Sequence, residues 1–488
     1  MDVRARDAAG VGVPVRRAVT LLLVALLAGC TATPPAPKPS AGPPAPPAPP
    51  PAGGQQPFGA HWDPNRHQQF EPYLRSISGS ATYHELTWCE VEKEKGRPDW
   101  SDVDRVAERT RALGITLNLK IRVGMCWATD GTAEHVRGQA GKTESAMPRD
   151  LAAYASFVDG VVRRYAAYGV PTYAVENEVN SQSYWSGSAA DYERLVTTAA
   201  RAIRAADPKA KVADSGISSV GYGFGVVDRL LRDGKEADAV AAYRAYFARR
   251  IGTRGQQIPD ASDAARLRTA LATDADRRHV EFLAVTEKLL ADKVVDVRQV
   301  HYYEPFDGVP ALLDYLRART PQGTPVQAWE VGQFWRDGEG DDVRRSQEMV
   351  KTVAQLVAGG LGPVMWLPLA YNPDNKQGSE VRYGLLDPDG KTRLAGTVFA
   401  ALASEARGAS VEVVSGKGLT GVAFRKGGAS ALVVWASGGP VKVPAADGLT
   451  AAVLGSGEPK AGAVEVGEAP VLIRTPRAPA EVLATVRG

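Results

Sequence analysis

The sequence predicts an α/β fold, a (β/α)8 TIM barrel followed by a small C-terminal antiparallel β-sandwich domain. Between about residues 57 and 403, eight short apolar segments alternate with helical patterns. This alternation is typical of a parallel sheet with crossover helices. From about residue 404 the helical patterns stop, and short alternating runs separated by Gly, Pro and Asp replace them. Eight strand–helix pairs in one region are what an eight-stranded barrel requires.

Each predicted barrel strand is a short run of apolar and β-branched residues next to a helical pattern. The eight strands are expected at residues 58–62, 82–88, 115–121, 172–175, 211–214, 297–303, 326–330 and 364–367. Active sites of such barrels lie at the carboxyl ends of the strands. We therefore look for chemistry in the residues that end each of these segments.

The barrel region, about 57–403, is longer than the ~250 residues of a usual barrel, and most of the excess lies between the fifth and sixth strands. Residues 222–292 in this interval predict extra helices. An insertion at this place covers the face that carries the active site, so we interpret it as part of a substrate cleft or lid. A helical decoration without substrate contact is the alternative.

The C-terminal region, residues 404–488, predicts a small antiparallel β-domain. Its alternating runs lie at residues 410–414, 420–424, 431–435, 441–443, 451–454 and 471–474. This pattern favours a sandwich. Trp435 is the single Trp of the region, which is little for a sugar-binding surface. We expect the domain to pack on the barrel as a structural element.

The first 56 residues predict export and tethering. Arginines precede an apolar run at residues 18–27, which ends in Leu27-Ala28-Gly29-Cys30. Residues 1–30 are therefore expected to be a signal peptide, because the run is shorter than the ~20 apolar residues of a membrane span. The ending resembles a bacterial lipobox, which implies lipidation of Cys30 and a membrane anchor. An ordinary signal peptide with a chance Cys is the alternative.

A linker is predicted after this leader. Residues 31–56 are dominated by Pro, Ala and Gly, which bury little apolar surface and favour an extended, unpacked tether. Together, leader and linker predict a protein outside the cytoplasm, lipid-anchored to a bacterial membrane at the cell surface or in the periplasm.

The cysteines predict one disulfide. If Cys30 carries lipid, Cys89 and Cys126 remain, and an even remainder in an exported protein indicates a bridge. They follow the second and third predicted strands, and neighbouring strands would bring them close. Two separate buried thiols are the alternative. No Cys/His cluster has metal-ligand spacing, so neither a metal nor a cofactor is expected.

The charge balance gives no support for a nucleic-acid partner. The chain has 58 Lys and Arg against 55 Asp and Glu, a formal net charge of +3, and no basic block. Nine Trp are present, eight of them between Trp62 and Trp366. They suit a cleft that stacks sugar rings, and they suit an ordinary large core almost as well.

Two glutamates carry the functional prediction. Glu178 lies in the run V-E-N-E-V-N, after the fourth predicted strand, and Glu330 ends the seventh, in Q-A-W-E-V-G. Two carboxylates that different strands deliver to one cleft are the minimum equipment for cleaving a glycosidic bond. One donates a proton to the leaving oxygen, and the other attacks or stabilises the sugar cation.

Further motifs appear in order along the predicted barrel. W-C-E-V-E-K-E-K-G at residues 88–96 follows the second strand, Asn177-Glu178 follows the fourth, and His301-Tyr302-Tyr303 ends the sixth. With Glu330 and Trp366 on the seventh and eighth, the region of about 57–403 resembles the clan A glycoside hydrolases. Family 39 is the nearest match in these motifs, and family 5 a weaker one.

The resemblance implies a role for each matched residue. Glu178 would be the acid and base, and Glu330 the nucleophile. Tyr303 can donate a hydrogen bond to the Glu330 carboxylate and keep it charged and oriented. The remaining matches imply contacts with the substrate. Asn177 would bond to a sugar 2-hydroxyl, His301 would bind sugar hydroxyls, and Trp366 would stack on the face of a sugar ring.

Two features depart from a simple match. Clan A members commonly carry an Arg on the second strand that orients the nucleophile, and none occurs at residues 82–87. Tyr83, His84 or Arg122 could take its place. In addition, strict strand alternation would point Glu176 and Glu178 to one face. A bulge must then be assumed if Asn177 also faces the cleft.

These observations predict a retaining glycoside hydrolase that cleaves an extracellular or cell-envelope polysaccharide or oligosaccharide through a glycosyl-enzyme intermediate. The alternative is a weakly active or inactive barrel lipoprotein that binds polysaccharide without turnover. The two differ in one observable, the hydrolysis of glycosides by the wild-type chain and its loss on substitution of the glutamates.

Overall fold

The computed structural model describes residues 56–61, 67–129, 144–252, 258–336, 339–371 and 383–486. The predicted signal peptide (1–30), the predicted lipidation site Cys30 and the linker up to residue 55 lie outside the described residues. Among the helices described, none combines the length and the apolar character needed to cross a membrane.

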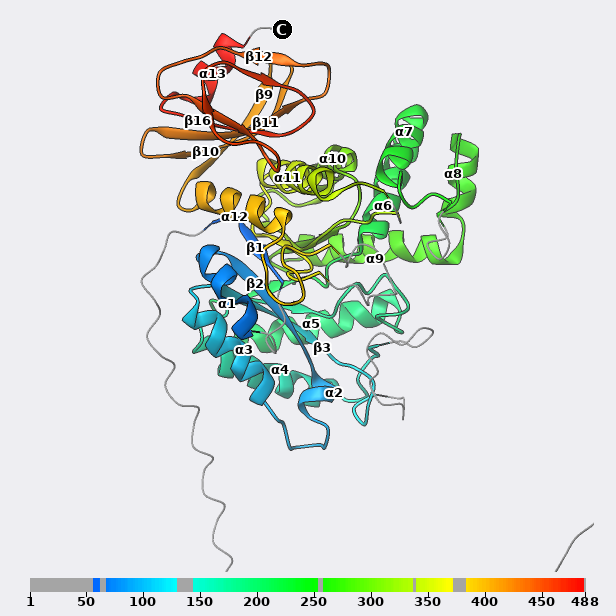
Figure 1. The fold of residues 1–488 in the computed structure, drawn as a ribbon. Helices are drawn as coiled ribbons and strands as arrows, with labels where there is room; N and C mark the ends of the chain where they lie inside the picture. The colour runs from blue at the N-terminus through cyan, green and yellow to red at the C-terminus, as the bar shows by residue number, and fades with distance from the viewer. Residues whose placement is uncertain are drawn as a thin grey trace, which may run out of the picture. The chain divides into compact units, whose positions relative to one another are not determined.

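Eight parallel strands form one sheet in the order β5-β4-β3-β2-β1-β8-β7-β6 (Figure 1). Single bridges from Ala213 to Val297 and from Ile217 to Val300 join β5 to β6 and close the barrel. The strands are β1 Phe58–Ala60, β2 Ala81–Thr87, β3 Thr116–Arg122, β4 Thr172–Val175, β5 Lys211–Ala213, β6 Arg298–Tyr302, β7 Val326–Val331 and β8 Val364–Trp366. The predicted (β/α)8 barrel is confirmed, with every strand end within two residues of its predicted position.

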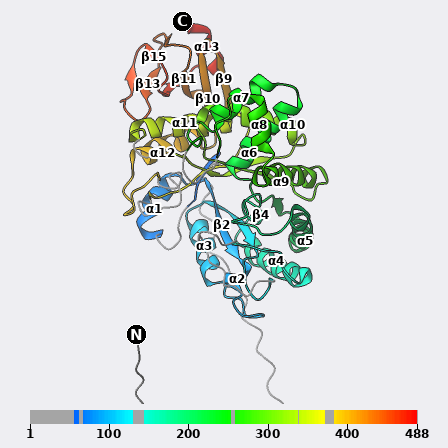
Figure 2. The same cartoon turned by 90° about the vertical axis from the view of Figure 1, so that its right-hand side faces the viewer.

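Helices surround the barrel and follow its strands. They are α1 His67–Ser76, α2 Trp88–Val91, α3 Ser101–Ala112, α4 Leu151–Ala166, α5 Ala189–Ala206, α10 Val309–Arg319, α11 Asp342–Ala358 and α12 Leu394–Ala406. Polar side chains begin several of them, since the first N–H groups of a helix have no partner within it. Asp150 accepts from two amides of α4, and Ser188 and Asp191 form a capping box at α5. Helices α4 and α5 lie side by side in both views (Figures 1 and 2).

The barrel interior is packed with side chains. Those that form its apolar cluster are Ala81, Tyr83, Ala174, Ala213, Val297, Trp329 and Met365. Tyr83 and Trp329 stack with their ring centroids 5.9 Å apart. Because this layer fills the interior, it supports the polar residues that lie nearer the carboxyl ends of the strands.

The predicted helical insertion is confirmed as helical and contacts the region after β4. Its helices are α6 Ser219–Arg232, α7 Glu236–Tyr246, α8 Ala264–Leu271 and α9 Asp274–Ala291. Arg278 of α9 donates to the carbonyl oxygens of Val179, Asn180, Trp185 and Gly187. The insertion therefore holds the segment that follows Glu178, and its part in a substrate cleft or lid stays a prediction.

The C-terminal domain has two antiparallel sheets, as predicted. One has the order β14-β13-β16-β11-β10-β9, and the other pairs β12 with β15. The elements are β9 Ser410–Gly416, β10 Leu419–Lys426, β11 Ala429–Ala436, β12 Val441–Val443, β13 Thr450–Val453, β14 Lys460–Ala461, β15 Val464–Val466, β16 Val471–Thr475 and α13 Pro479–Thr485. The short β14 and β15 and helix α13 were not predicted from the sequence.

The C-terminal domain shares part of its core with the barrel. Phe424 and Trp435 belong to the same hydrophobic cluster as Phe58 and Phe399. The Phe58 and Phe424 rings meet edge to face, with centroids 6.0 Å apart. This continuity supports the structural role expected for the domain.

A disulfide joins Cys89 to Cys126, as predicted, with their Cα atoms 5.6 Å apart. It connects the start of α2 to the segment after β3. Gly124 lies against it with a positive φ of 92°, and a Cβ there would come within 2.8 Å of the Cβ atom of Cys89. A glycine is therefore needed at this position.

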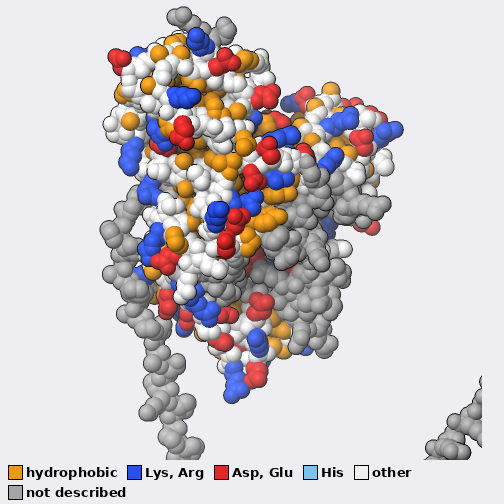
Figure 3. Space-filling view, viewed as in Figure 1, with side chains coloured by type: hydrophobic (Ala, Val, Ile, Leu, Met, Phe, Trp, Pro, Cys, Tyr) orange, Lys and Arg blue, Asp and Glu red, His pale blue; other side chains and the backbone are white. Residues whose placement is uncertain are grey.

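Charged side chains of both signs are interspersed over the described surface shown in Figure 3, without a continuous basic patch on that face.

Candidate active site

The backbone after β4 separates two glutamates that strand alternation would place together. Strand β4 ends at Val175, and both Glu176 and Glu178 adopt the left-handed conformation, with φ of 66° and 41°. These two turns replace the bulge expected from the sequence. Glu176 is fully buried, whereas the Glu178 side chain keeps 13% of its surface exposed. Positive φ is strained for residues other than glycine, and such strain concentrates at functional sites.

The barrel brings Glu178 and Glu330 together, as predicted. One carboxylate oxygen of each, and a ring nitrogen of His301, all lie within 4.8 Å of one another. The His301 Nδ1 atom is 2.8 Å from Oε1 of Glu178 and 3.4 Å from Oε2 of Glu330. His301 thus lies between the two carboxylates at the end of β6.

Glu330 is surrounded by hydrogen-bond donors. Tyr303 Oη donates to Oε2 at 2.9 Å, which is the contact predicted for Tyr303, and Lys120 Nζ donates to Oε1 at 2.5 Å. Burial, the largest influence, would raise the pKa of Glu330, but His301 in its protonated form and the Lys120 ammonium group lower it to about 2. Glu330 is therefore ionised at neutral pH, the state that a nucleophile requires.

Lys120 was not identified from the sequence. It lies in β3, its side chain is fully buried, and it also donates to Oδ1 of Asn177 at 2.7 Å. Its ammonium group lies 4.4 Å from the centre of the Tyr83 ring, so Tyr83 supports Lys120 through a cation–π contact. Lys120 thus takes the place of the missing arginine.

Arg122, the other candidate for that place, serves a different group. It donates to Glu144 at 2.8 Å and lies 3.5 Å from Glu85 and 3.7 Å from Glu176. Polar side chains at alternating positions of β3, Asn118, Lys120 and Arg122, were the signal in the sequence. In a strand covered on both sides, this period of two marks the face that points into the barrel.

The surroundings of His301 determine which of its nitrogens carries hydrogen. Gln299 donates through Nε2 to the carbonyl oxygen of Asp214 at 2.9 Å, which turns its Oε1 toward His301 Nε2, 2.9 Å away. With Gln299 in this orientation Nε2 carries the hydrogen of the shorter bond, and the Lys120 ammonium nitrogen lies 3.4 Å from the same Nε2. The 2.8 Å contact of Nδ1 with Glu178 then needs one further proton, held by either partner. The pair can keep a proton beside Glu178.

Comparisons with known proteins agree with the fold that carries this site. No family model and no curated protein matches the sequence. Among solved structures, a family 39 glycoside hydrolase from the gut symbiont Bacteroides cellulosilyticus WH2 superposes with a TM-score of 0.59 at 14% identity, over 86% of this chain and 81% of that one. The chain has the fold of a family 39 glycoside hydrolase.

Two other structures agree. A family 39 β-xylosidase from Caulobacter crescentus has a TM-score of 0.54 at 17% identity, over 87% of this chain and 97% of that one. A glucosidase from Croceicoccus marinus has a TM-score of 0.54 at 12% identity, over 87% and 96%. At these identities the likeness concerns the fold, so the chemistry has to be argued from the side chains.

Of two predicted substrate contacts, Asn177 lies beside the carboxylate pair and Trp366 does not. Asn177 is 5% exposed, and its Oδ1 is engaged by Lys120, which leaves its amide nitrogen without a protein acceptor among the described residues. Trp366 is 1% exposed and packs in the core between barrel and helices, while its neighbour Met365 points into the barrel. The structure therefore does not bring Trp366 to the site, because strand alternation turns it outward.

Glu178, His301 and Glu330 are also the one group among the described residues whose donor atoms are close enough to suggest a metal ion. The Lys120 ammonium group, 2.5 Å from Glu330, already supplies a positive charge there. A second cation beside it would be repelled, so the set suits proton transfer and nucleophilic attack better than metal binding.

Proposed function

We propose that the protein is a retaining glycoside hydrolase, in which Glu330 is the nucleophile and Glu178 is the acid and base. The observation that carries the proposal is a pair of carboxylates that have oxygens within 4.8 Å of each other and differ in their hydrogen-bond partners. Lys120 and Tyr303 bond to one, and His301 can share a proton with the other. Retaining enzymes hold their carboxyl groups about 5–5.5 Å apart, whereas inverting enzymes need about 6.5–9.5 Å to admit a water molecule.

The reaction proceeds in two displacements. In the first, a Glu330 oxygen attacks the anomeric carbon, the bond to the leaving oxygen breaks, and Glu178 gives that oxygen its proton. In the second, Glu178 takes a proton from water, the water oxygen attacks the anomeric carbon, and Glu330 leaves as a carboxylate. Lys120 and Tyr303 hold Glu330 in place through both steps. The Asn177 amide nitrogen, whose oxygen is already engaged by Lys120, would donate to a sugar hydroxyl.

The proposed substrate is an extracellular or cell-envelope polysaccharide or oligosaccharide, and the proposed location is outside the cytoplasm with a lipid anchor at Cys30. The leader and the Pro-rich segment support this location. The Cys89–Cys126 disulfide supports it independently, because such bonds persist in oxidising compartments.

The test is an assay of the full chain, purified in a mild detergent, against polysaccharides and aryl glycosides. The anomeric form of the first product is followed by proton NMR. We expect hydrolysis with retention of configuration, and its loss in Glu178→Gln and Glu330→Gln. Glu108→Gln, exposed on α3, is the matched control. Hydrolysis that survives both site substitutions would refute the proposal, and binding without turnover would indicate the inactive sugar-binding alternative.

A further inference from the structure

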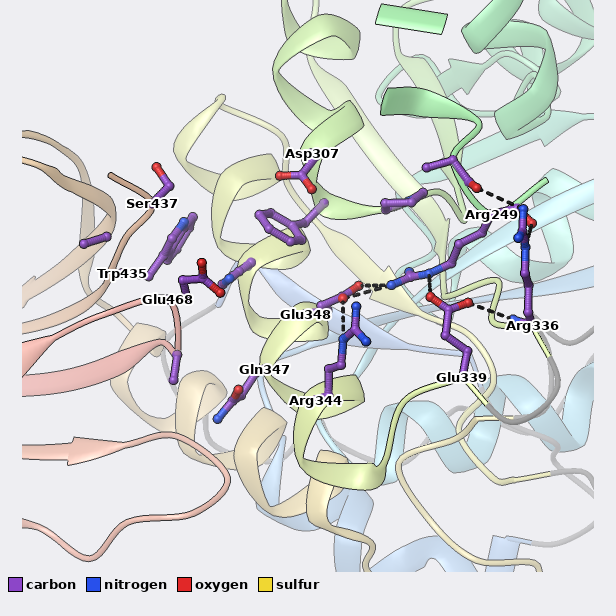
Figure 4. A pocket seen from close by; sticks show the side chains of 16 residues that line it. Arg249, Asp307, Arg336, Glu339, Arg344, Gln347, Glu348, Trp435, Ser437 and Glu468 are labelled. Carbon is purple, nitrogen blue, oxygen red and sulfur yellow. Dashed lines mark hydrogen bonds and ion pairs between the residues drawn. The ribbon is translucent and has the colours of Figure 1, made fainter. Parts of the chain in front are cut away.

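A second cavity lies apart from the carboxylate pair, between the barrel and the C-terminal domain. Its volume is about 940 Å³, within the range of about 300–1,000 Å³ that small-molecule sites occupy. The barrel contributes residues after β6 and β7 and residues of α11, and the β-domain contributes Trp435, Ser437 and Glu468 (Figure 4). Neither Glu178 nor Glu330 lines it.

In one part of the cavity the charged side chains are paired with one another. Arg249 bonds to Glu348 at 2.7 Å and to Glu339 at 3.0 Å, and Arg344 lies 3.5 Å from Glu348. The dashed lines of Figure 4 gather around these residues. These groups have protein partners and give the cavity a fixed wall.

The other part has polar groups that the protein leaves without partners. Asp307 and Glu468 line the cavity, are exposed, and have no hydrogen bond or ion pair with any described residue. Lys351 lines it too, is 8% exposed, and has no carboxylate within ion-pair distance in the described parts of the chain. Its ammonium group lies over the Phe306 ring, 4.3 Å from the centroid. A buried ammonium group without a hydrogen-bond acceptor is costly unless something else fills that need.

The charged side chains of the cavity determine which kind of ligand it can bind. The cavity is lined by four basic and four acidic side chains, so it has no net preference for an ion. An anion beside Lys351 would meet the Asp307 and Glu468 carboxylates, and a cation would meet Lys351 and Arg344. A hydroxyl group satisfies both, because it can accept from the ammonium group and donate to a carboxylate at once.

We propose that this cavity is a second glycan-binding site, which takes neutral sugar units through Lys351, Asp307 and Glu468. Sugars carry several hydroxyl groups in a fixed arrangement, which matches donors and acceptors that are held apart on two domains. Trp435 lines the same cavity and contributes an indole wall. The choice of a glycan over another polyol rests on the proposed hydrolase function, but the site itself does not.

The experiment measures binding in the full chain with Glu330→Gln, so that no substrate is consumed. Xylohexaose, cellohexaose and mannohexaose are titrated by calorimetry, with a galacturonic acid oligomer as the anionic probe. We expect at least one neutral hexasaccharide to bind at two sites per chain, and Asp307→Asn with Glu468→Gln to weaken one of them by about tenfold or more. The anionic oligomer should not bind to the second site.

Glu465→Gln is the matched control, because Glu465 is exposed in β15 of the same domain and does not line the cavity. Lys351→Met is the second test variant, since it keeps the side-chain length and removes the ammonium group. If all variants bind as the parent does, or if no neutral hexasaccharide occupies a second site, the inference is wrong. If the second site binds but the wild-type chain hydrolyses no glycoside, the proposed function fails and this site stands.

Discussion

The Lys120 ammonium nitrogen lies 2.5 Å from Oε1 of Glu330, although 210 positions separate the two residues in the chain. Both are buried, and the contact joins β3 to β7 across the barrel interior. A charge-assisted hydrogen bond in such a buried environment is stronger than one at the surface, because the local dielectric constant is lower. Lys120 therefore acts as a positioning residue for Glu330 and keeps its carboxylate ionised.

Replacing Lys120 tests this relationship. In Lys120→Met the pKa of Glu330 should rise, because one of the charges that lower it to about 2 is gone. The acidic limb of the kcat/KM profile should then move to higher pH, and the rate at its plateau should fall by about 10–100-fold, the equivalent of one hydrogen bond to a charged group. Lys442→Met, exposed in β12, should leave the profile unchanged. An unmoved acidic limb in Lys120→Met would contradict the assigned role.

Glu178→Ala tests the role of the acid and base. Hydrolysis of substrates with poor leaving groups should fall by about 10²–10⁴-fold, because no acid then protonates the leaving oxygen. Aryl glycosides with good leaving groups should still form the glycosyl-enzyme. Azide should then enter the vacated space and yield a glycosyl azide of retained configuration, detected by NMR. An azide product of inverted configuration, or no azide product at all, would refute the two-step reaction.

The disulfide should contribute substantially to stability. Cys89 and Cys126 are 37 positions apart, and closing a loop of this length stabilises the folded state by about 3–4 kcal/mol in the chain-entropy model. The Cys89→Ser, Cys126→Ser double variant should show this loss in urea unfolding. Dithiothreitol should destabilise the wild type by a similar amount and have no effect on the variant. Equal stability with and without the reductant would show that the bond is not formed in solution.

Glu176 should make stability depend on pH. Burial, opposed by Arg122 and by two hydrogen bonds, raises its pKa from 4.5 to about 7. The folded state then holds this proton over a pH range in which the unfolded chain has released it, so stability falls as pH rises from about 4.5 to 7. Glu176→Gln removes this loss, and its Tm relative to wild type should rise between pH 5 and pH 8. A Tm difference that stays constant or shrinks would contradict the raised pKa; Glu108→Gln is the control.

Most of the barrel could be predicted because short segments with apolar and β-branched residues alternate with helical patterns along the chain. The carboxyl ends of parallel strands meet at one face, so Glu178, His301, Tyr303 and Glu330 could be assigned to one site before their distances were known. The disulfide followed from the same adjacency of β2 and β3. In each case the local pattern and the topology agree.

The remaining features depend on information that local patterns lack. Lys120 was visible as a charged residue in a buried strand, but its partner lies on a strand far along the chain. Trp366 ends a strand of three residues, too short to show which neighbour faces inward. Strands β14 and β15, with two and three residues, have no period to detect. The left-handed backbone at Glu176 and Glu178 could not be predicted, because a glutamate rather than a glycine or asparagine holds each of these two positions.

At Glu178 the demand for backbone stability conflicts with the demand for catalytic activity. A glycine at position 178 would relieve the left-handed backbone strain, worth about 1–3 kcal/mol, and would remove the acid and base at the same time. Directed evolution for heat resistance alone should therefore enrich variants that have lost turnover at this residue. Any engineering of a more robust chain has to couple its thermal screen to an activity screen.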